Sequence, residues 1–232
     1  SALFNAKCVG GDWYMIYAMS DIHGCYDKFT QMLKKINFTK EDRLIINGDI
    51  FDRGKEPLKI LDYVVSNDNV IFIPGNHEYM FLEFYATGNS KSWFYNGGYT
   101  TYNQICKRGQ KYADSLYNWL SRLDLVYIYG KFIITHAGLY LPENQNNYTL
   151  EQIIDMQDTD YVLWSRSQIG NERRYKDYTI INGHTPTLYI DPSQKEMSIL
   201  KQNGTIYTDC GAVFDDGRLA CLRLDDMKEF YV

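Results

Sequence analysis

The chain contains four histidines, and each lies in a short motif beside aspartate, asparagine, glycine or threonine. Imidazole is the commonest side-chain metal ligand and the usual proton carrier near neutral pH. A fifth motif, between the first two, adds two carboxylates and a guanidinium. We therefore expect these motifs to form a single site. In chain order they are Asp21-Ile-His23-Gly24, Gly48-Asp49-Ile50-Phe51-Asp52-Arg53-Gly54, Gly75-Asn76-His77-Glu78, Thr135-His136-Ala137-Gly138 and Gly183-His184-Thr185-Pro186.

These residue types suit a centre that holds two metal ions. Two divalent cations about 3.5–4 Å apart can clamp the attacking and leaving oxygens of a displacement reaction. Such a centre requires oxygen and imidazole ligands, and one carboxylate that reaches both ions. The motifs contain both kinds of ligand.

The spacing of apolar residues predicts how these motifs are positioned. Three short apolar runs, each followed directly by one of the first three motifs, read as strands separated by helical segments. This βαβ order is typical of an α/β protein, in which ligand sites gather at the carboxyl ends of the strands. The predicted strands are 15–20, 43–47 and 70–73, with helices over 26–36 and about 58–65; residues 78–123 are mainly helical, and short strands follow at 126–129, 132–134, 178–181, 205–207 and 219–224.

Length and composition limit the classes of protein to which this chain can belong. A length of 232 residues favours one domain, which we place at residues 15–232, with 1–14 an irregular extension or tag remnant. The net charge of −5 argues against a nucleic-acid partner. No apolar stretch approaches the roughly 20 residues that span a bilayer, and no secretory signal is visible. Five cysteines without a C-x-x-C pair favour reduced thiols and a cytoplasmic location.

The five motifs in this order closely resemble the metal-dependent phosphoprotein phosphatase family within the calcineurin-like metallophosphoesterases. The small bacterial and phage-type serine/threonine phosphatases are the most similar branch, and the resemblance extends from Asp21 to about Leu224. It implies a four-layer α/β sandwich, in which two central mixed β-sheets are flanked by helices.

The resemblance also assigns a role to each site residue. His77 matches the general acid that protonates the leaving alkoxide, and Asp52 matches the carboxylate that orients it. Arg53 matches one phosphate-binding arginine, and Leu163-Trp164-Ser165-Arg166 resembles the segment that carries another, Arg166. A hydroxide bridging the metals would attack phosphorus in line. The implied ligands are Asp21, His23 and Asp49 for one metal and Asn76, His136 and His184 for the other, with Asp49 bridging the two.

Three readings of the function stay open at this stage. The leading one is hydrolysis of phosphoserine or phosphothreonine in proteins, with two Mn²⁺ ions by resemblance, although Fe and Zn suit the same ligands. The alternative is a bis(5'-nucleosyl)-tetraphosphatase, which shares the D-x-H-G motif; Glu78 and Asp52 favour the first reading. A non-catalytic module that binds metal or phosphate is the third. Pro186 stands where many phosphodiesterases of the superfamily carry another histidine, which favours a phosphomonoesterase. The partner would be a phosphoprotein or a small phosphorylated substrate.

Local alternatives also exist for three of the site residues. Asp52 could cap the helix that starts near Glu56, and Arg53 could pair with a surface carboxylate. Arg173 and Arg174 lie close enough in sequence to replace Arg166 in binding phosphate.

Overall fold

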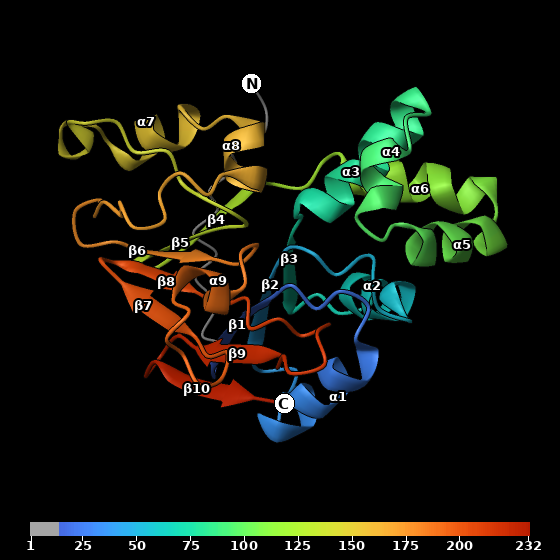
Figure 1. Cartoon of the computed structure of the whole chain (residues 1–232), viewed down its shortest axis with the longest axis horizontal. Helices are drawn as coiled ribbons and strands as arrows, with labels where there is room; N and C mark the ends of the chain where they lie inside the picture. The colour runs from blue at the N-terminus through green and yellow to red at the C-terminus, as the bar shows by residue number, and fades with distance from the viewer. Residues whose placement is uncertain (1–13) are drawn as a thin grey trace.

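The computed structural model describes residues 14–232, so most of the extension that we predicted at residues 1–14 lies outside the described residues. Two five-stranded mixed β-sheets form the centre of the molecule (Figure 1). The strands are β1 (Ile16–Ser20), β2 (Arg43–Asn47), β3 (Val70–Ile73), β4 (Val126–Tyr129), β5 (Phe132–Thr135), β6 (Thr179–Asn182), β7 (Leu200–Gln202), β8 (Thr205–Tyr207), β9 (Ala220–Arg223) and β10 (Lys228–Tyr231).

Both sheets have a parallel centre and antiparallel additions. The first has the order β10-β9-β1-β2-β3, in which β1, β2 and β3 are parallel and β9 runs antiparallel to β1. The second has the order β4-β5-β6-β8-β7, with β5, β6 and β8 parallel. Ser20 lies opposite Asn47, and Asn47 lies opposite Ile73. The motifs after these three strands therefore leave the sheet along one edge, as the sequence predicted.

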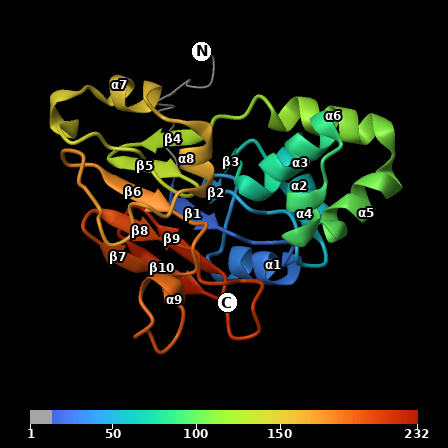
Figure 2. The ribbon, with the colours of Figure 1, turned by 45° about the horizontal axis from the view of Figure 1, so that its top comes forward.

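Helices cover the outer face of each sheet. Figure 2 shows α1 to α6 gathered on one side of the molecule and α7 and α8 on the other, as does Figure 1. The helices are α1 (Tyr26–Lys35), α2 (Pro57–Val65), α3 (Asn76–Thr87), α4 (Lys91–Tyr95), α5 (Tyr99–Arg108), α6 (Gln110–Leu120), α7 (Leu150–Asp155), α8 (Thr159–Trp164), α9 (Thr187–Ile190) and a 3₁₀ turn, η1 (Gln145–Asn147). None of these helices is long and apolar enough to cross a membrane.

The side chains of β1 are buried on both faces of the sheet, and the two faces belong to different core clusters. Successive side chains of a strand point to opposite faces of the sheet. Tyr17 and Met19 belong to the core cluster that contains Phe29 of α1. Ile16 and Ala18 belong instead to the cluster between the sheets, together with residues of β5, β6 and β8. The order of layers is therefore helices, sheet, sheet and helices, which confirms the predicted four-layer sandwich.

Several short elements have no counterpart among those predicted from the sequence. No strand was predicted at β7 or β10 and no helix at α7, α8 or α9. The two missed strands are short edge strands with polar, partly exposed residues such as Lys201 and Lys228, so they lack the apolar run that marks a buried strand. The three missed helices contain only four to six residues, too few for helical periodicity to show.

Candidate active site

The loops that carry the predicted site have unusual backbone conformations. Among the described residues, ten non-glycine residues have a positive φ, and six of them belong to the predicted site. Such conformations cost on the order of 1–3 kcal/mol each and persist only where surrounding contacts fix them. The fold therefore holds this backbone in place. The six residues are Asp21, His23, Asp49, Asp52, Arg53 and His184, with φ between 44° and 67°.

One buried carboxylate, that of Glu78, holds the loop after β2. Its Oε2 accepts the backbone N–H groups of Asp49 and Gly75, at 3.0 and 2.7 Å. Its Oε1 accepts those of Ile50 and Phe51, both at 3.0 Å. Glu78 lies in the first turn of α3, where the helix dipole favours negative charge. Burial, and then the Asp49 carboxylate, nevertheless raise the pKa of Glu78 to about 7.

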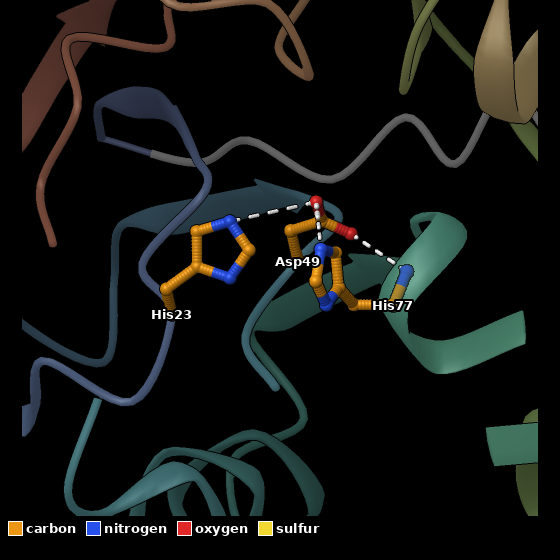
Figure 3. Close-up of side chains that lie close together, drawn as sticks. All are labelled: His23, Asp49 and His77. Atoms are coloured by element: carbon orange, nitrogen blue, oxygen red, sulfur yellow. Dashed lines mark hydrogen bonds and ion pairs between the residues drawn. The ribbon is translucent and has the colours of Figure 1, made fainter. Parts of the chain in front are cut away.

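The carboxylate of Asp49 lies at the centre of the site. Its Oδ2 is 3.4 Å from Nε2 of His136, 3.6 Å from Nε2 of His23 and 3.9 Å from Nε2 of His77. Figure 3 shows His23 and His77 on either side of this carboxylate, with the backbone N–H of His77 donating to Oδ1 at 3.1 Å. Burial alone would raise the pKa of Asp49, but the imidazoles, His136 foremost, hold it well below its usual range.

A second group of ligand atoms surrounds Asn76. Its Oδ1 lies 2.9 Å from Nε2 of His136 and 2.9 Å from Nδ1 of His184. Burial lowers the pKa of His136, but Asp49 outweighs burial and raises it to about 9. Burial, and then the charge on His136, lower the pKa of His184 to about 3. His184 is therefore a neutral imidazole, and its Nε2 is buried without a partner among the described residues.

His77 and Asp52 form a buried pair. Nδ1 of His77 donates to Oδ2 of Asp52 at 2.6 Å. The same oxygen accepts from Nε1 of Trp93 at 2.8 Å, while Oδ1 accepts the hydroxyl of Thr101 at 2.6 Å. The Asp52 carboxylate thus accepts hydrogen bonds from these three side chains. The N-cap of α2 is Glu56, so Asp52 does not cap that helix.

Two arginines lie on the solvent side of the centre. The guanidinium of Arg53 donates to Nε2 of His23 at 2.9 Å and to Nε2 of His77 at 3.0 Å. Nε of Arg166 donates to Oγ1 of Thr185 at 3.0 Å, and both arginines line one cavity beside His184. Arg53 therefore faces the imidazoles instead of pairing with a surface carboxylate.

Asp21 approaches the centre from the end of β1. Both of its carboxylate oxygens lie 3.0 Å from the backbone N–H of His184. Burial, and then the Asp209 carboxylate, raise its pKa well above the usual range. A Cβ on Gly183 would lie 2.2 Å from Oδ2 of Asp21, so only glycine allows this approach. The compact ligand group around His23 and Asp49 contains His77 rather than Asp21.

The structure thus brings together all ten residues that the sequence analysis selected, in and around one centre. It also shows residues that support the site and that were not predicted from the sequence to do so. Trp93 and Thr101 fix Asp52, and Glu78 fixes the loop of Asp49. Asn47 is another, since its amide donates to the backbone oxygen of Thr135 in the second sheet at 2.8 Å. The one signal in the sequence was a polar residue directly after the apolar run 44–46 of β2, which marks Asn47.

A buried carboxylate surrounded by imidazoles at the edge of two stacked sheets is the arrangement of a metal-dependent hydrolase. The family model for calcineurin-like phosphoesterases matches residues 14–219. The chain therefore belongs to the calcineurin-like phosphoesterases, which confirms the resemblance drawn from its motifs.

Named relatives fall into two groups. Serine/threonine-protein phosphatase 2 of Salmonella typhimurium is 33% identical over 166 residues, which cover 69% of this chain and 72% of the relative. The symmetrical bis(5'-nucleosyl)-tetraphosphatase of Nitrosospira multiformis is 32% identical over 126 residues, 53% of this chain but only 43% of that protein. A solved serine/threonine phosphatase of Saccharomyces cerevisiae shares the fold, with a TM-score of 0.61, 15% identity and coverage of 95% of this chain and 79% of that one.

Proposed function

We propose that this chain is a metal-dependent phosphomonoesterase that acts on phosphoserine and phosphothreonine in proteins, and that residues 15–232 form its single catalytic domain. The observation that carries the proposal is the central carboxylate of Asp49, which lies within 3.9 Å of three imidazole nitrogens. A pair of divalent cations requires one carboxylate that can bind both ions, and Asp49 lies between the two groups of ligands.

The residues around Asp49 fit a metal pair. Ligands bound at about 2.0–2.2 Å lie roughly 3.0–3.5 Å from one another in octahedral or tetrahedral geometry. The contacts of Asn76 with His136 and His184 are 2.9 Å, and His136 lies 3.4 Å from Asp49. We assign Asp21, His23 and Asp49 to one cation and Asn76, His136 and His184 to the other, with Asp49 shared. Mn²⁺ is our proposed metal by the resemblance to the family, since imidazole and carboxylate ligands suit Mn, Fe and Zn alike.

The reaction is the displacement of an alcohol from phosphorus by water. Bound cations would neutralise charge on the phosphate oxygens and lower the pKa of the attacking water. Arg53 and Arg166 bind further phosphate oxygens, because a planar guanidinium matches two oxygens at once. As the oxygen of water bonds to phosphorus, the bond from phosphorus to the leaving oxygen breaks. In the structure Nε2 of His77 accepts a hydrogen bond from the guanidinium of Arg53. When Arg53 turns to the phosphate, Nε2 of His77 in its protonated form can give the leaving oxygen its proton, and the proton lost by the attacking water replaces it.

Asp52 acts through His77 in this scheme. Its carboxylate accepts Nδ1–H of His77, which fixes the orientation and tautomer of the ring. Because Trp93 and Thr101 hold the carboxylate, the imidazole stays aligned during turnover.

Dinucleoside polyphosphates are the second candidate substrates, favoured by the similarity to tetraphosphatases. A substrate panel separates the two. Metal-stripped protein, reloaded with Mn²⁺, Fe²⁺ or Zn²⁺ in turn, is given a phosphoserine peptide and diadenosine tetraphosphate. We expect a higher kcat/KM for the peptide and the highest turnover with Mn²⁺. A large preference for the dinucleotide would overturn the proposed substrate while leaving the metal centre intact.

The role of His77 has its own test. His77→Asn should lower kcat on the phosphopeptide by roughly 10²–10⁴-fold, the usual contribution of a general acid. The metal content, measured by elemental analysis, should stay at that of the parent chain because His77 is not an assigned ligand. Unchanged kcat refutes the acid role, and a loss of one metal per chain makes His77 a ligand instead.

A further inference from the structure

Another cavity lies within the layer of helices that covers the first sheet. Figures 1 and 2 both show α3, α4, α5 and α6 together on that side of the molecule. The cavity between these four helices has a volume of about 300 Å³, and none of the ten predicted site residues lines it. All four helices contribute side chains to its walls, among them Phe81, Phe84 and Tyr85 of α3, Trp93 of α4, Tyr102 of α5 and Ala113 of α6.

The walls of this cavity suit an uncharged aromatic molecule. Five of the lining side chains are aromatic, and no charged residue of the described part of the chain lines the cavity. Aromatic rings attract one another in stacked or edge-to-face arrangements, beyond the effect of burial alone. An apolar cavity of about 150 Å³ holds one benzene molecule, so this cavity has room for two rings. Its open side lies where α5 ends and α6 begins, at the exposed residues Cys106, Gly109 and Gln110.

Trp93 connects this cavity to the proposed catalytic pair. Its ring is 1% exposed and lines the cavity, and its Nε1 donates to Oδ2 of Asp52 at 2.8 Å. A Cβ on Gly98 would lie 2.6 Å from Cδ1 of Trp93, so the ring packs directly on this glycine. From α5, the hydroxyl of Thr101 donates to Oδ1 of Asp52 at 2.6 Å. Two of the three side chains bonded to Asp52 therefore come from helices that line the cavity.

We propose that this cavity is a regulatory binding site for an uncharged molecule of one or two aromatic rings, which acts on the catalytic pair through Trp93. A side chain that borders an empty space lacks packing partners on that side. A bound ring supplies them and restricts the movement of the indole, which keeps its N–H on Asp52 and keeps His77 aligned. The binding goes beyond the proposed function, whereas its effect on turnover rests on the roles proposed for Asp52 and His77.

Binding is measured by titration calorimetry of the metal-loaded chain with 2-naphthol, an uncharged two-ring compound at neutral pH. We expect a Kd below about 1 mM. Ala113→Phe puts a ring into the cavity from α6 and should weaken binding by about tenfold or more. The matched control is Ser115→Phe, because Ser115 is exposed on the same helix and does not line the cavity. No binding by the parent chain, or equal binding by Ala113→Phe, overturns the inference.

The thiol of Cys106 gives a second measurement that needs no variant. Cys106 is exposed and lines the cavity, whereas Cys25 is partly exposed and does not line it. Bound 2-naphthol should slow the alkylation of Cys106 by N-ethylmaleimide in proportion to the filled fraction of sites, measured by mass spectrometry of the peptide that contains it. The rate at Cys25 should not change. An unchanged rate at Cys106 under saturating 2-naphthol places the probe elsewhere and overturns the inference.

The link to the active site is measured as kcat on the phosphoserine peptide with and without 2-naphthol. We expect an increase of about fivefold, the lower end of usual allosteric effects, with KM unchanged. Trp93→Phe keeps a ring in the wall but has no N–H for Asp52, so it should bind 2-naphthol while its kcat no longer responds.

Three results would overturn the regulatory role: an unchanged kcat in the parent chain, a response of Trp93→Phe equal to that of the parent, or inhibition that is competitive with the peptide. The last of these would place the probe in the catalytic cavity. A parent chain that binds 2-naphthol but hydrolyses neither the phosphoserine peptide nor diadenosine tetraphosphate overturns the proposed function instead, and the binding site stands without it.

Discussion

Replacing Glu78 by glutamine tests whether this carboxylate holds the metal-binding loop. Each of its two oxygens accepts two backbone N–H groups, from Asp49 and Gly75 and from Ile50 and Phe51. In glutamine one oxygen becomes an NH₂ group, which cannot accept. Two buried N–H groups then lose their partner, whichever way the amide is turned.

The magnitude follows from these two lost bonds. A buried donor left without an acceptor costs about 1–3 kcal/mol, so two of them cost about 2–6 kcal/mol. Removing a buried negative charge offsets part of this cost. We therefore expect Glu78→Gln to lower the free energy of unfolding by about 2–4 kcal/mol, a large part of the roughly 5–15 kcal/mol typical of a native protein.

The assay is urea unfolding of metal-free protein, followed by circular dichroism at a pH well above 7, where Glu78, with a pKa of about 7, is ionised. Glu83→Gln is the matched control, because Glu83 lies on the same helix and is exposed, and surface substitutions usually stay within about 0.5 kcal/mol. A Glu78→Gln variant as stable as the control refutes the reasoning. Loss of stability with full metal content and kcat would show that Glu78 supports the fold but not the geometry of the centre.

Three further predictions concern the centre itself. Asp52→Asn should lower kcat by roughly 10–100-fold, since a hydrogen bond to a charged group contributes about 1.5–3 kcal/mol. The metal content should change little. A kcat equal to that of the parent chain would contradict this prediction. Asp49→Asn should reduce occupancy at both metal positions, measured by elemental analysis, and full occupancy argues against a shared ligand. The raised pKa of His136, about 9, means that this imidazole is protonated at pH 7.5 and must lose its proton to bind a metal. Titration calorimetry of metal-free protein with Mn²⁺ in two buffers of different ionisation enthalpy should show release of about one proton from this group, and an affinity that rises as the pH rises toward 9; binding without proton release contradicts this.

Part of the site could be predicted from sequence because it depends on local structure. Asp21, Asp49 and Asn76 each follow an apolar strand, and parallel strands end at one edge of a sheet. Their convergence therefore required only the βαβ order. The placement of His136 and His184 did not follow in this way, since no pattern of spacing shows how a second sheet packs on the first. The resemblance to the family supplied it.

The supporting residues escaped prediction because their partners are distant in the sequence. In the sequence Trp93 is indistinguishable from an ordinary aromatic core residue, and in the structure it does belong to the core cluster. Its N–H reaches Asp52 only because the turn between α4 and α5 lies against the loop after β2, where the N–H of Arg53 donates to the carbonyl of Gly97 at 3.2 Å. Such contacts depend on tertiary packing, which periodicity does not describe.

The centre therefore depends on how the two sheets pack. Asp49 follows β2, whereas His136 and His184 follow β5 and β6 of the other sheet. Between them, the amide of Asn47 donates to the carbonyl of Thr135, and the cluster between the sheets is almost wholly aliphatic. Cations bound by the proposed ligands from both sheets would favour the packed arrangement over any that separates them, so metal would stabilise the fold by an amount that grows with the logarithm of its concentration. On this proposal the aliphatic layer between the sheets helps to set the affinity for metal, although none of its residues is an assigned ligand.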